Sequence, residues 1–293
     1  MMTEIYLNGE FLPEEEAKIS VYDHGLLYGD GVFEGIRIYN KKIFKLKEHV
    51  DRLYESANTI SLNIPMSKEE LTRKIIETCR RNKKVDGYIR VVVSRGVGDL
   101  GLSPFTCKKP TVIIITKSIK VYSNENGLKL ITTSVRRNPP QCLSPNIKSL
   151  NYLNNILGKI EAHQRNVDEA LFLDIDGYVS EATVDNVFFV KDEVIITPPT
   201  STNLKGITRA TVLDIAKKLG YDTSISNFIL SDIHNADEIF LTGTAAEVEP
   251  VIEIDSRKIG DGKPGKITMH IKEEYKKLVN STGAPIYEKI SLE

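Results

Sequence analysis

Neither sign of charge is in excess in this sequence, because 39 lysines and arginines stand against 40 aspartates and glutamates. A protein dedicated to binding nucleic acid would usually carry a basic excess or stripe, and an electrostatic membrane anchor needs a basic cluster. The sequence also lacks any apolar run near the roughly 18 residues that a membrane-spanning helix requires. We therefore expect neither a nucleic acid nor a membrane as a partner.

Cysteine is scarce, and the histidines are not paired. The three cysteines, Cys79, Cys107 and Cys142, lie far apart without a CxxC motif, which argues against a disulfide framework and a zinc cluster. The five histidines show no HxH or HExxH spacing, so we expect no metal site. Residues 1–11 lack the basic start and apolar core of a signal peptide. These absences predict a protein of the reducing cytoplasm.

What the sequence does contain is an ordinary globular composition, with 41% apolar and 27% charged residues over 293 positions. At roughly 150 residues per domain, this length suggests about two domains. The polar stretch 122–127 is the best candidate for a linker. We expect a small N-terminal α/β domain over 1–118, an interdomain loop over 119–127 and a larger C-terminal domain over 128–293. Both halves mix helices and strands, which predicts an α+β protein.

Hydrophobic periodicity and turn residues give the expected elements. Strands are predicted at 31–39, 43–46, 88–94, 111–116, 170–174, 178–180, 187–190, 194–197, 223–230, 238–242 and 248–254. Helices are predicted at 50–60, from Ser67 onward, and at 149–165, 207–219 and 266–279. The helix that opens at Ser67 has Glu70 three residues further on, which is the pattern of a capping box.

A glycine-rich segment, Gly96 to Gly101, matches the GxGxxG pattern of dinucleotide-binding proteins and follows a predicted strand. Such a site also needs a helix that receives the pyrophosphate, with an acid about 20 residues further on. Pro104 and Pro110 oppose a helix here, and no acid follows the motif before Glu125. We therefore interpret the segment as a loop, of the kind that often forms a lid.

One lysine differs sharply from its surroundings. Between Asn138 and Gly158, a stretch of 21 residues, Lys148 is the only charged side chain, where the average composition would place about five or six. The pKa of a lysine falls readily on desolvation, and a neutral amine attacks a carbonyl carbon. The alternative is a surface lysine at the start of a helix, and this feature alone leaves both interpretations open.

Three further features bear on that choice. Ser180-Glu181 places an acid in a strand. The segment Leu204 to Arg209 puts a glycine and a threonine at a helix start, where backbone N–H groups favour phosphate. A second turn of small residues, Leu241 to Ala246, follows another strand. A nucleophilic lysine, a carboxylate and phosphate-binding turns are together what a pyridoxal 5'-phosphate (PLP) site requires.

The sequence resembles the class IV, fold-type IV PLP-dependent aminotransferases, and its pattern is most similar to that of the branched-chain amino acid aminotransferases. The resemblance runs from about Tyr6 to Ile267. Its blocks are Tyr28-Gly-Asp-Gly-Val-Phe-Glu-Gly-Ile-Arg37, Glu48-His-Val-Asp-Arg52-Leu, Ile147-Lys-Ser-Leu-Asn-Tyr152-Leu-Asn-Asn, Ser180-Glu181, Leu204-Lys-Gly-Ile-Thr-Arg209 and Thr242-Gly-Thr-Ala-Ala-Glu247. It implies a two-domain D-amino acid aminotransferase-like fold with the cofactor cleft between the domains, and a homodimer or higher homo-oligomer.

The resemblance implies PLP as the cofactor and gives its contacts. Lys148 is expected to carry the cofactor and to shuttle the proton, while Glu181 pairs with the pyridine nitrogen and keeps it protonated. Tyr152 is expected to hydrogen-bond the phenolic oxygen, and Arg52 to bind the phosphate as a charge-assisted donor. The other implied cofactor contacts lie in the two turns, at Leu204, Gly206, Ile207, Thr208, Gly243 and Thr244.

The implied substrate site takes an apolar side chain and also accepts glutamate. Its contacts are, in chain order, Tyr28, Phe33, Gly35, Arg37, Tyr88, Arg90, Thr244 and Ala245. The first three line the pocket, the last two bind the α-carboxylate through backbone N–H groups, and the others help to hold the second carboxylate of glutamate. The loop 96–103 would close the site, which in a dimer is that of the neighbouring subunit.

The implied activity is transfer of the amino group of L-leucine, L-isoleucine or L-valine to 2-oxoglutarate through a pyridoxamine form of the cofactor. D-amino acid aminotransferase, (R)-amine transaminase and aminodeoxychorismate lyase are alternatives within the class. Phe33 and Gly35 favour the branched-chain activity, because D-specific relatives tend to carry tyrosines there. Outside the class, a nucleotide-binding oxidoreductase would rest on residues 96–101 alone, and a non-catalytic binding module would require every block to be structural.

Two residues depart from the family pattern. Many members place glycine and small polar residues after the acid, where this chain has Ala182-Thr183-Val184. We expect Val184 to tighten the site or alter the polarity around the pyridine ring. Lys205 adds a charge beside the phosphate-binding turn and either assists binding or points to solvent. Both departures leave rate and substrate preference open.

Overall fold

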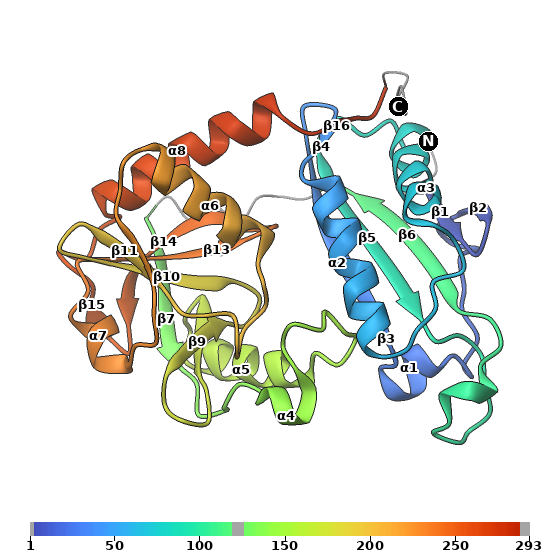
Figure 1. Cartoon of the computed structure of the whole chain (residues 1–293), viewed down its shortest axis with the longest axis horizontal. Coiled ribbons are helices and arrows are strands. Elements are labelled where there is room, and N and C mark those ends of the chain that lie inside the picture. The colour runs from blue at the N-terminus through green and yellow to red at the C-terminus, as the bar shows by residue number, and fades with distance from the viewer. Residues whose placement is uncertain (1–2, 119–125, 288–293) are drawn as a thin grey trace. The chain divides into compact units, whose positions relative to one another are not determined.

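The computed structural model describes residues 3–118 and 126–287, and the chain forms two compact units (Figure 1). The N-terminal unit comprises Met1–Lys120, Ile147–Asn151 and Val279–Glu293, and the C-terminal unit comprises Val121–Asn146 and Tyr152–Leu278. The N-terminal unit therefore includes two pieces from late in the chain. The predicted interdomain loop, 119–127, lies outside the described residues except at its last two positions, and the predicted domain boundaries stay a prediction.

The N-terminal unit is built on a seven-stranded antiparallel sheet, in the order β16-β4-β3-β5-β6-β1-β2, with two long helices on one face (Figure 1). Its strands are β1 (Glu4–Leu7), β2 (Glu10–Pro13), β3 (Gly31–Tyr39), β4 (Lys42–Ile43), β5 (Gly87–Ser94), β6 (Thr111–Lys117) and β16 (Ala284–Pro285). Its helices are α1 (His24–Tyr28), α2 (Leu46–Thr59) and α3 (Lys68–Arg81), with a short 3-10 helix at Pro104–Thr106.

The two faces of strand β3 have different surroundings. Because side chains alternate along a strand, Val32, Ile36 and Ile38 point toward α2 and α3 and join the buried core. Phe33 and Gly35 point the other way. One face of β3 therefore belongs to the hydrophobic core, and its other face carries Phe33 and Gly35.

Several short-range signals in this unit are confirmed, but the predicted strand 43–46 is wrong, because β4 ends at Ile43 and helix α2 already begins at Leu46. Helix α3 begins as predicted, since the Ser67 hydroxyl accepts from the Glu70 N–H and the Glu70 carboxylate accepts from the Ser67 N–H. After the GxGxxG segment, residues 102–110 contain only the three-residue 3-10 helix, which agrees with a loop and not with a dinucleotide site. Helix α1 was not predicted, because five residues are too few to show a helical period.

The C-terminal unit contains a nine-stranded sheet, and β9 pairs with both β8 and β10, so that part of the sheet closes on itself. Its strands are β7 (Leu128–Thr132), β8 (Glu169–Leu173), β9 (Val179–Ala182), β10 (Asn186–Lys191), β11 (Val194–Thr197), β12 (Thr223–Ile225), β13 (Glu238–Gly243), β14 (Glu247–Ile254) and β15 (Arg257–Lys258). Its helices are α4 (Pro140–Leu143), α5 (Leu153–Gln164), α6 (Ile207–Lys218), α7 (Leu230–His234) and α8 (Lys266–Ser281).

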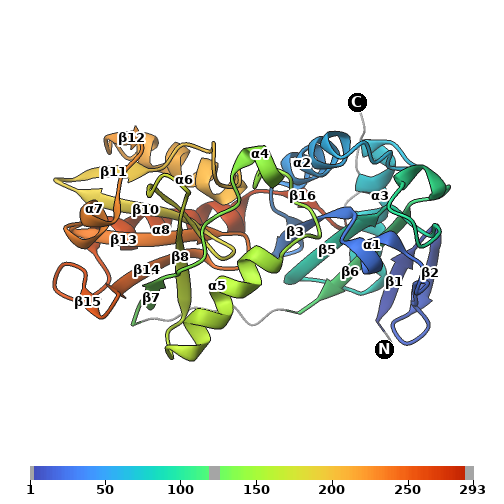
Figure 2. The same ribbon diagram turned by 90° about the horizontal axis from the view of Figure 1, so that it is seen from below.

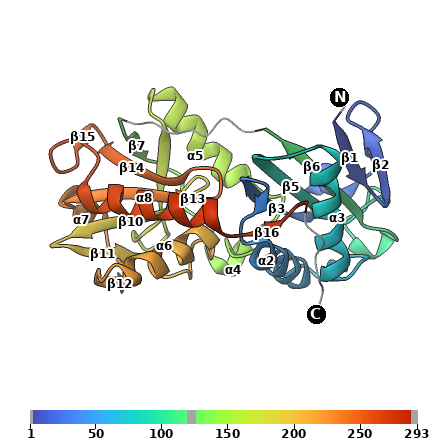
Figure 3. The same ribbon diagram turned by 90° about the horizontal axis from the view of Figure 1, so that it is seen from above.

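Helices cover this sheet on more than one side. Helix α5 packs beside β8 (Figure 2), and α8 is tied to β13 and β14 through Thr268–Glu238 and Lys272–Glu249 contacts (Figure 3). Within the described ranges, no helix is long and apolar enough to cross a membrane.

Two sequence-based boundaries are wrong in this half of the chain. The predicted helix 149–165 begins only at Leu153, because Ser149 forms a β-bridge with Val32 and the Leu150 N–H donates to the Gly31 carbonyl. The predicted strand 223–230 ends at residue 225, and helix α7 begins at Leu230, the last residue of the predicted strand. In both cases hydrogen bonds to residues distant in the chain override the local pattern.

Candidate active site

Lys148 lies in an extended segment, residues 147–151, that runs along the edge of β3 within the N-terminal unit. Its carbonyl accepts a hydrogen bond from the Phe33 N–H at 2.9 Å, and its own N–H donates to Ser56 Oγ of α2 at 3.1 Å. The Lys148 side-chain nitrogen stands 4.7 Å from the centre of the Phe33 ring. The backbone of this half-buried lysine is thus anchored on both sides, which fixes where its amine can reach.

Beside this lysine, neighbouring residues of β3 and β5 form a mixed apolar and cationic surface. Gly35 lies directly opposite Arg90 in the sheet, so the two residues share one face. A Cβ at Gly35 would collide with the Tyr88 hydroxyl, so glycine lets this tyrosine lie against the strand. The Arg90 guanidinium lies 4.5 Å from the centre of the Phe33 ring and donates to Tyr88 Oη at 3.3 Å. Four predicted substrate residues are therefore brought together with the lysine.

Two other predicted substrate residues of this unit make different contacts. The Tyr28 hydroxyl donates to the Leu100 carbonyl at 2.6 Å, which ties α1 to the glycine-rich loop. Arg37 is buried, with its guanidinium 4.6 Å from the centre of the Tyr39 ring. Their predicted roles toward substrate stay predictions.

Arg52, the predicted phosphate ligand, is held by a buried carboxylate that sequence reasoning missed. Its Nε and Nη2 donate to the two carboxylate oxygens of Glu34 at 2.7 and 3.0 Å, and His49 Nδ1 lies 2.7 Å from Glu34 Oε2. Burial raises the pKa of Glu34, but the charges of Arg52 and His49 and their hydrogen bonds outweigh it and hold the pKa at about 2. Burial lowers the pKa of His49 against the opposing charge of Glu34. Nδ1 donates in this contact, because a carboxylate only accepts.

In the C-terminal unit, Glu181 is likewise held by an arginine that was not predicted. Arg137 Nε donates to Glu181 Oε1 at 2.7 Å, and both side chains are more than nine-tenths buried. The Leu204 N–H donates to Glu181 Oε2 at 3.1 Å. Arg137 also donates to Asn154 Oδ1 at 2.7 Å and to Asn155 Oδ1 at 3.2 Å, which fixes its guanidinium on α5. Both oxygens of the Glu181 carboxylate are therefore oriented by donors from separate segments.

The start of helix α6 has the features of an anion site. Gly206 is its N-cap and provides no side-chain cap, and the first backbone bond within the helix runs from Ala210 N–H to the Gly206 carbonyl. The N–H groups of Ile207 and Thr208 therefore have no acceptor within the helix. A Cβ at Gly206 would collide with Asn186 Oδ1, so glycine is required for this close approach.

A second turn in the same unit follows β13. Residues 244–246 form the turn, and a Cβ at Gly243 would collide with Asp185 Oδ1. Thr242 Oγ1, just before it, is buried without a hydrogen-bond partner among the described residues. Thr244 and Ala245, within the turn, are half-buried.

The remaining predicted positions of this unit are more exposed. Tyr152 is half-buried and directly precedes α5. Val184 is 64% exposed, and its expected effect around the pyridine ring stays a prediction. The Lys205 side chain is also exposed.

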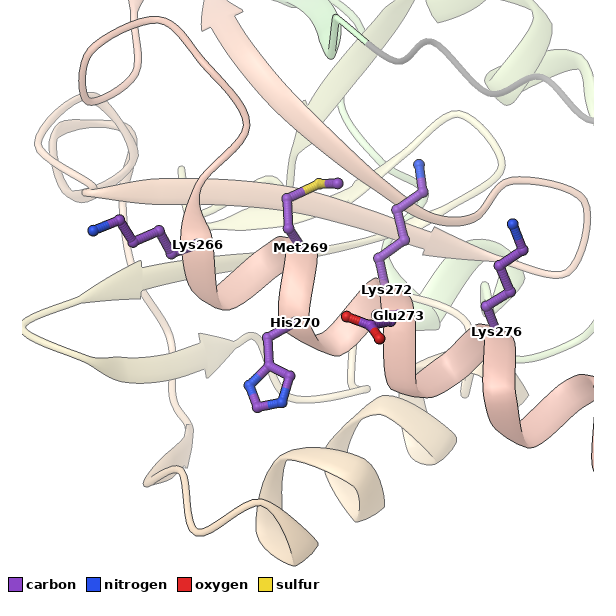
Figure 4. A pocket seen from close by; sticks show the side chains of 6 residues that line it. All are labelled: Lys266, Met269, His270, Lys272, Glu273 and Lys276. Carbon is purple, nitrogen blue, oxygen red and sulfur yellow. The ribbon is translucent and has the colours of Figure 1, made fainter.

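A surface hollow of about 680 Å³ lies on α8 and contains none of the predicted site residues (Figure 4). It is lined by Lys266, Met269, His270, Lys272, Glu273 and Lys276. All six lining residues belong to α8, so the hollow shares no residue with the groups around Lys148 and Glu181.

Comparison with known proteins identifies the family. Residues 31–254 match the model of the amino-transferase class IV family. A Methanocaldococcus jannaschii protein, named provisionally as a branched-chain-amino-acid aminotransferase, is 51% identical over 285 residues, covering 97% of this chain and 99% of that protein. The D-alanine aminotransferase of Listeria monocytogenes is 35% identical over 288 residues, covering 97% and 99%.

A solved structure gives the same result for the fold. The T.th. branched-chain amino acid aminotransferase, complexed with N-(5'-phosphopyridoxyl)-L-glutamate, has a TM-score of 0.92 at 43% identity, covering 96% of this chain and 95% of that one. The predicted α+β, fold-type IV architecture is therefore confirmed. Since the family match runs through both units and contains every predicted site residue except Tyr28, this chain belongs to the class IV aminotransferases.

Proposed function

We propose that this protein is a PLP-dependent aminotransferase that moves the amino group of L-leucine, L-isoleucine or L-valine to 2-oxoglutarate. The observation that carries the proposal is the grouping of Lys148 with Phe33, Gly35 and Arg90 in the N-terminal unit. An aromatic ring beside a strand glycine suits a branched apolar side chain, and an arginine suits the second carboxylate of glutamate. The Methanocaldococcus jannaschii and T.th. relatives, whose names carry the branched-chain activity, support this substrate class.

The residues present fit PLP. The N–H groups at the start of α6 suit a phosphate, and the buried Glu181 suits a protonated pyridine nitrogen. When bound, PLP supplies an electron sink for the substrate Cα and carries the amino group, as its pyridoxamine form, between two half-reactions. Lys148, Arg52, Tyr152 and Thr244 are the other residues that we propose hold the cofactor.

Side chains and backbone N–H groups of the protein would perform the other steps. Lys148 Nζ, in its neutral form, would accept the proton from the substrate Cα and return it later in the cycle. The Thr244 and Ala245 N–H groups would orient the α-carboxylate. Arg137 holds Glu181 in place, so that the carboxylate can keep a proton on the ring nitrogen. Turnover would thus depend on proton transfer at Lys148 and on a Glu181 carboxylate held in place by Arg137.

A parallel panel of amino donors tests the proposal. With 2-oxoglutarate as acceptor, L-leucine, L-isoleucine and L-valine should be converted faster than D-alanine or an (R)-amine. The wild type should bind PLP on Lys148, as shown by borohydride reduction followed by peptide mass spectrometry, and Lys148→Ala should lose transamination. A wild type without bound PLP, or full activity in Lys148→Ala, would reject the whole proposal.

A D-amino acid aminotransferase is the second candidate, favoured by the 35% identity to the Listeria D-alanine aminotransferase. It differs in the stereochemistry of the donor and not in the cofactor. D-alanine turnover above that of L-leucine would replace the branched-chain activity with this one.

We also propose that the enzyme works as a homodimer or larger homo-oligomer in the cytoplasm. Leu100, Leu102 and Phe105, in and after the glycine-rich loop, are at least two-thirds exposed, and apolar side chains gathered this way often mark an interface. The three cysteines are free thiols, which suits a reducing compartment. Light scattering on a size-exclusion column tests the assembly, and Phe105→Asp should lower the measured mass toward that of one chain.

A further inference from the structure

Glu34 and His49 occur in two of the sequence blocks, yet the proposed reaction leaves both without a role. Glu34 lies in β3 and points toward α2, where its two oxygens meet the Nε and Nη2 of Arg52. Oε2 also accepts from His49 Nδ1 at 2.7 Å and from the Gly35 N–H at 3.2 Å. Every one of these contacts lies within the N-terminal unit.

Two hydrogen bonds from the Arg52 guanidinium to one carboxylate fix the plane of the guanidinium. A single hydrogen bond would let the group rotate, whereas a two-point contact sets both its position and the direction of its other N–H groups. His49 holds the receiving carboxylate from a third direction. The orientation of Arg52 is therefore set by β3 and not by its own flexible side chain.

Helix α2 connects this arrangement to Lys148. His49, Arg52 and Ser56 are three and four residues apart, so they form one stripe on the helix. Ser56 Oγ accepts from the Lys148 N–H at 3.1 Å. The same helix face thus positions the reactive lysine and the guanidinium.

The burial of this pair argues against a purely stabilising role. Glu34 is 1% exposed, and a buried ion pair is often no more stabilising than packed apolar residues of similar size. An oriented guanidinium, by contrast, is useful for binding a phosphate, because its N–H groups must meet the phosphate oxygens in one geometry.

We propose that Glu34, supported by His49, is a positioning residue that orients Arg52 toward the phosphate end of the cofactor. This inference rests on the proposed function, because it takes PLP as the ligand. It makes a specific claim about which part of the cofactor depends on Glu34: the phosphate, and not the aldehyde or the ring.

Equilibrium binding of PLP and of pyridoxal, which lacks the phosphate, tests that claim on the apoprotein. Glu34→Gln should weaken PLP binding about 10- to 100-fold while changing pyridoxal binding less than about twofold. Arg52→Gln should show the same selective loss, and adding Glu34→Gln to it should cause little more, because both act through one guanidinium. Glu48→Gln, an exposed glutamate of the same helix that pairs with Lys45, is the matched control and should change neither affinity.

Equal losses for PLP and pyridoxal in Glu34→Gln would show a general structural role and overturn the inference, as would an unchanged PLP affinity. If that variant does not fold, Glu34→Asp keeps the charge but withdraws the carboxylate, and an unchanged ratio of the two affinities would overturn the inference there. A wild type that binds neither compound would instead reject the proposed function, and this inference with it.

Discussion

Replacing Arg137 with methionine should destabilise the protein strongly. Arg137 and Glu181 form an ion pair at 2.7 Å with side chains 7% and 6% exposed. Removing one partner of a buried pair leaves an uncompensated charge and costs roughly 3–5 kcal/mol. For a protein of this size, where 1 kcal/mol lowers the melting temperature by roughly 2–4 °C, the expected decrease is about 6 to 20 °C.

The measurement is thermal unfolding of the apoprotein by circular dichroism, since bound cofactor would stabilise the folded state by mass action. Lys191→Met is the control, because its pair with Asp237 in the same unit is exposed and should contribute less than about 1 kcal/mol. The double variant Arg137→Met/Glu181→Leu should recover most of the stability, since no buried charge is then left unpaired. A loss in Arg137→Met no larger than in Lys191→Met would refute the reasoning.

Three further predictions concern other parts of the N-terminal unit and the thiols. Gly35→Ala should lower kcat/KM for L-leucine about tenfold or more, because the new Cβ displaces the Tyr88 hydroxyl; an additional Tyr88→Phe should restore part of it in steady-state assays, and an unchanged rate would contradict the contact. Burial raises the pKa of Cys79 to about 12, so a thiol reagent followed by mass spectrometry should label exposed Cys142 well before Cys79 in the folded protein. The Glu34 carboxyl has a pKa of about 2 when folded, against 4.5 ordinarily. The ionised carboxylate therefore contributes its full stabilisation above pH 4.5 and loses it as the pH falls toward 2. The free energies of unfolding of wild type and Glu34→Gln, measured with urea, should converge between these two pH values. A constant difference between them would contradict the assignment.

An element of the fold could be predicted when the contacts that form it join residues close together in the sequence. The capping box at Ser67 and the strand 31–39 depend on neighbours in sequence, and both are confirmed. The start of α5 depends on backbone bonds between residues 148–150 and β3, more than 110 positions away, and the local pattern placed it four residues early. The periodicity of apolar residues does not show where such a long-range backbone pairing occurs.

The same distinction applies to the site. Lys148 was singled out because its isolation among uncharged residues is visible in the sequence, whereas Glu34 and Arg137 were missed. Their partners lie 18 and 44 residues away. A signal for Glu34 existed, since this acid stands inside the apolar run of the predicted strand 31–39, and a charge buried there requires a partner. The sequence alone does not show which arginine supplies it.

The late pieces of the N-terminal unit have a consequence for how a newly made chain matures. Residues 3–118 leave the ribosome before residues 147–151 and before β16, yet β3 needs the first of these segments as its edge partner and β4 needs the second. Until then the nascent sheet has an open edge, which is the kind of surface that recruits wrong partners. Lys148 therefore reaches its place only after β1 to β6 have been made, and the sheet beside it is completed only once β16 has been translated.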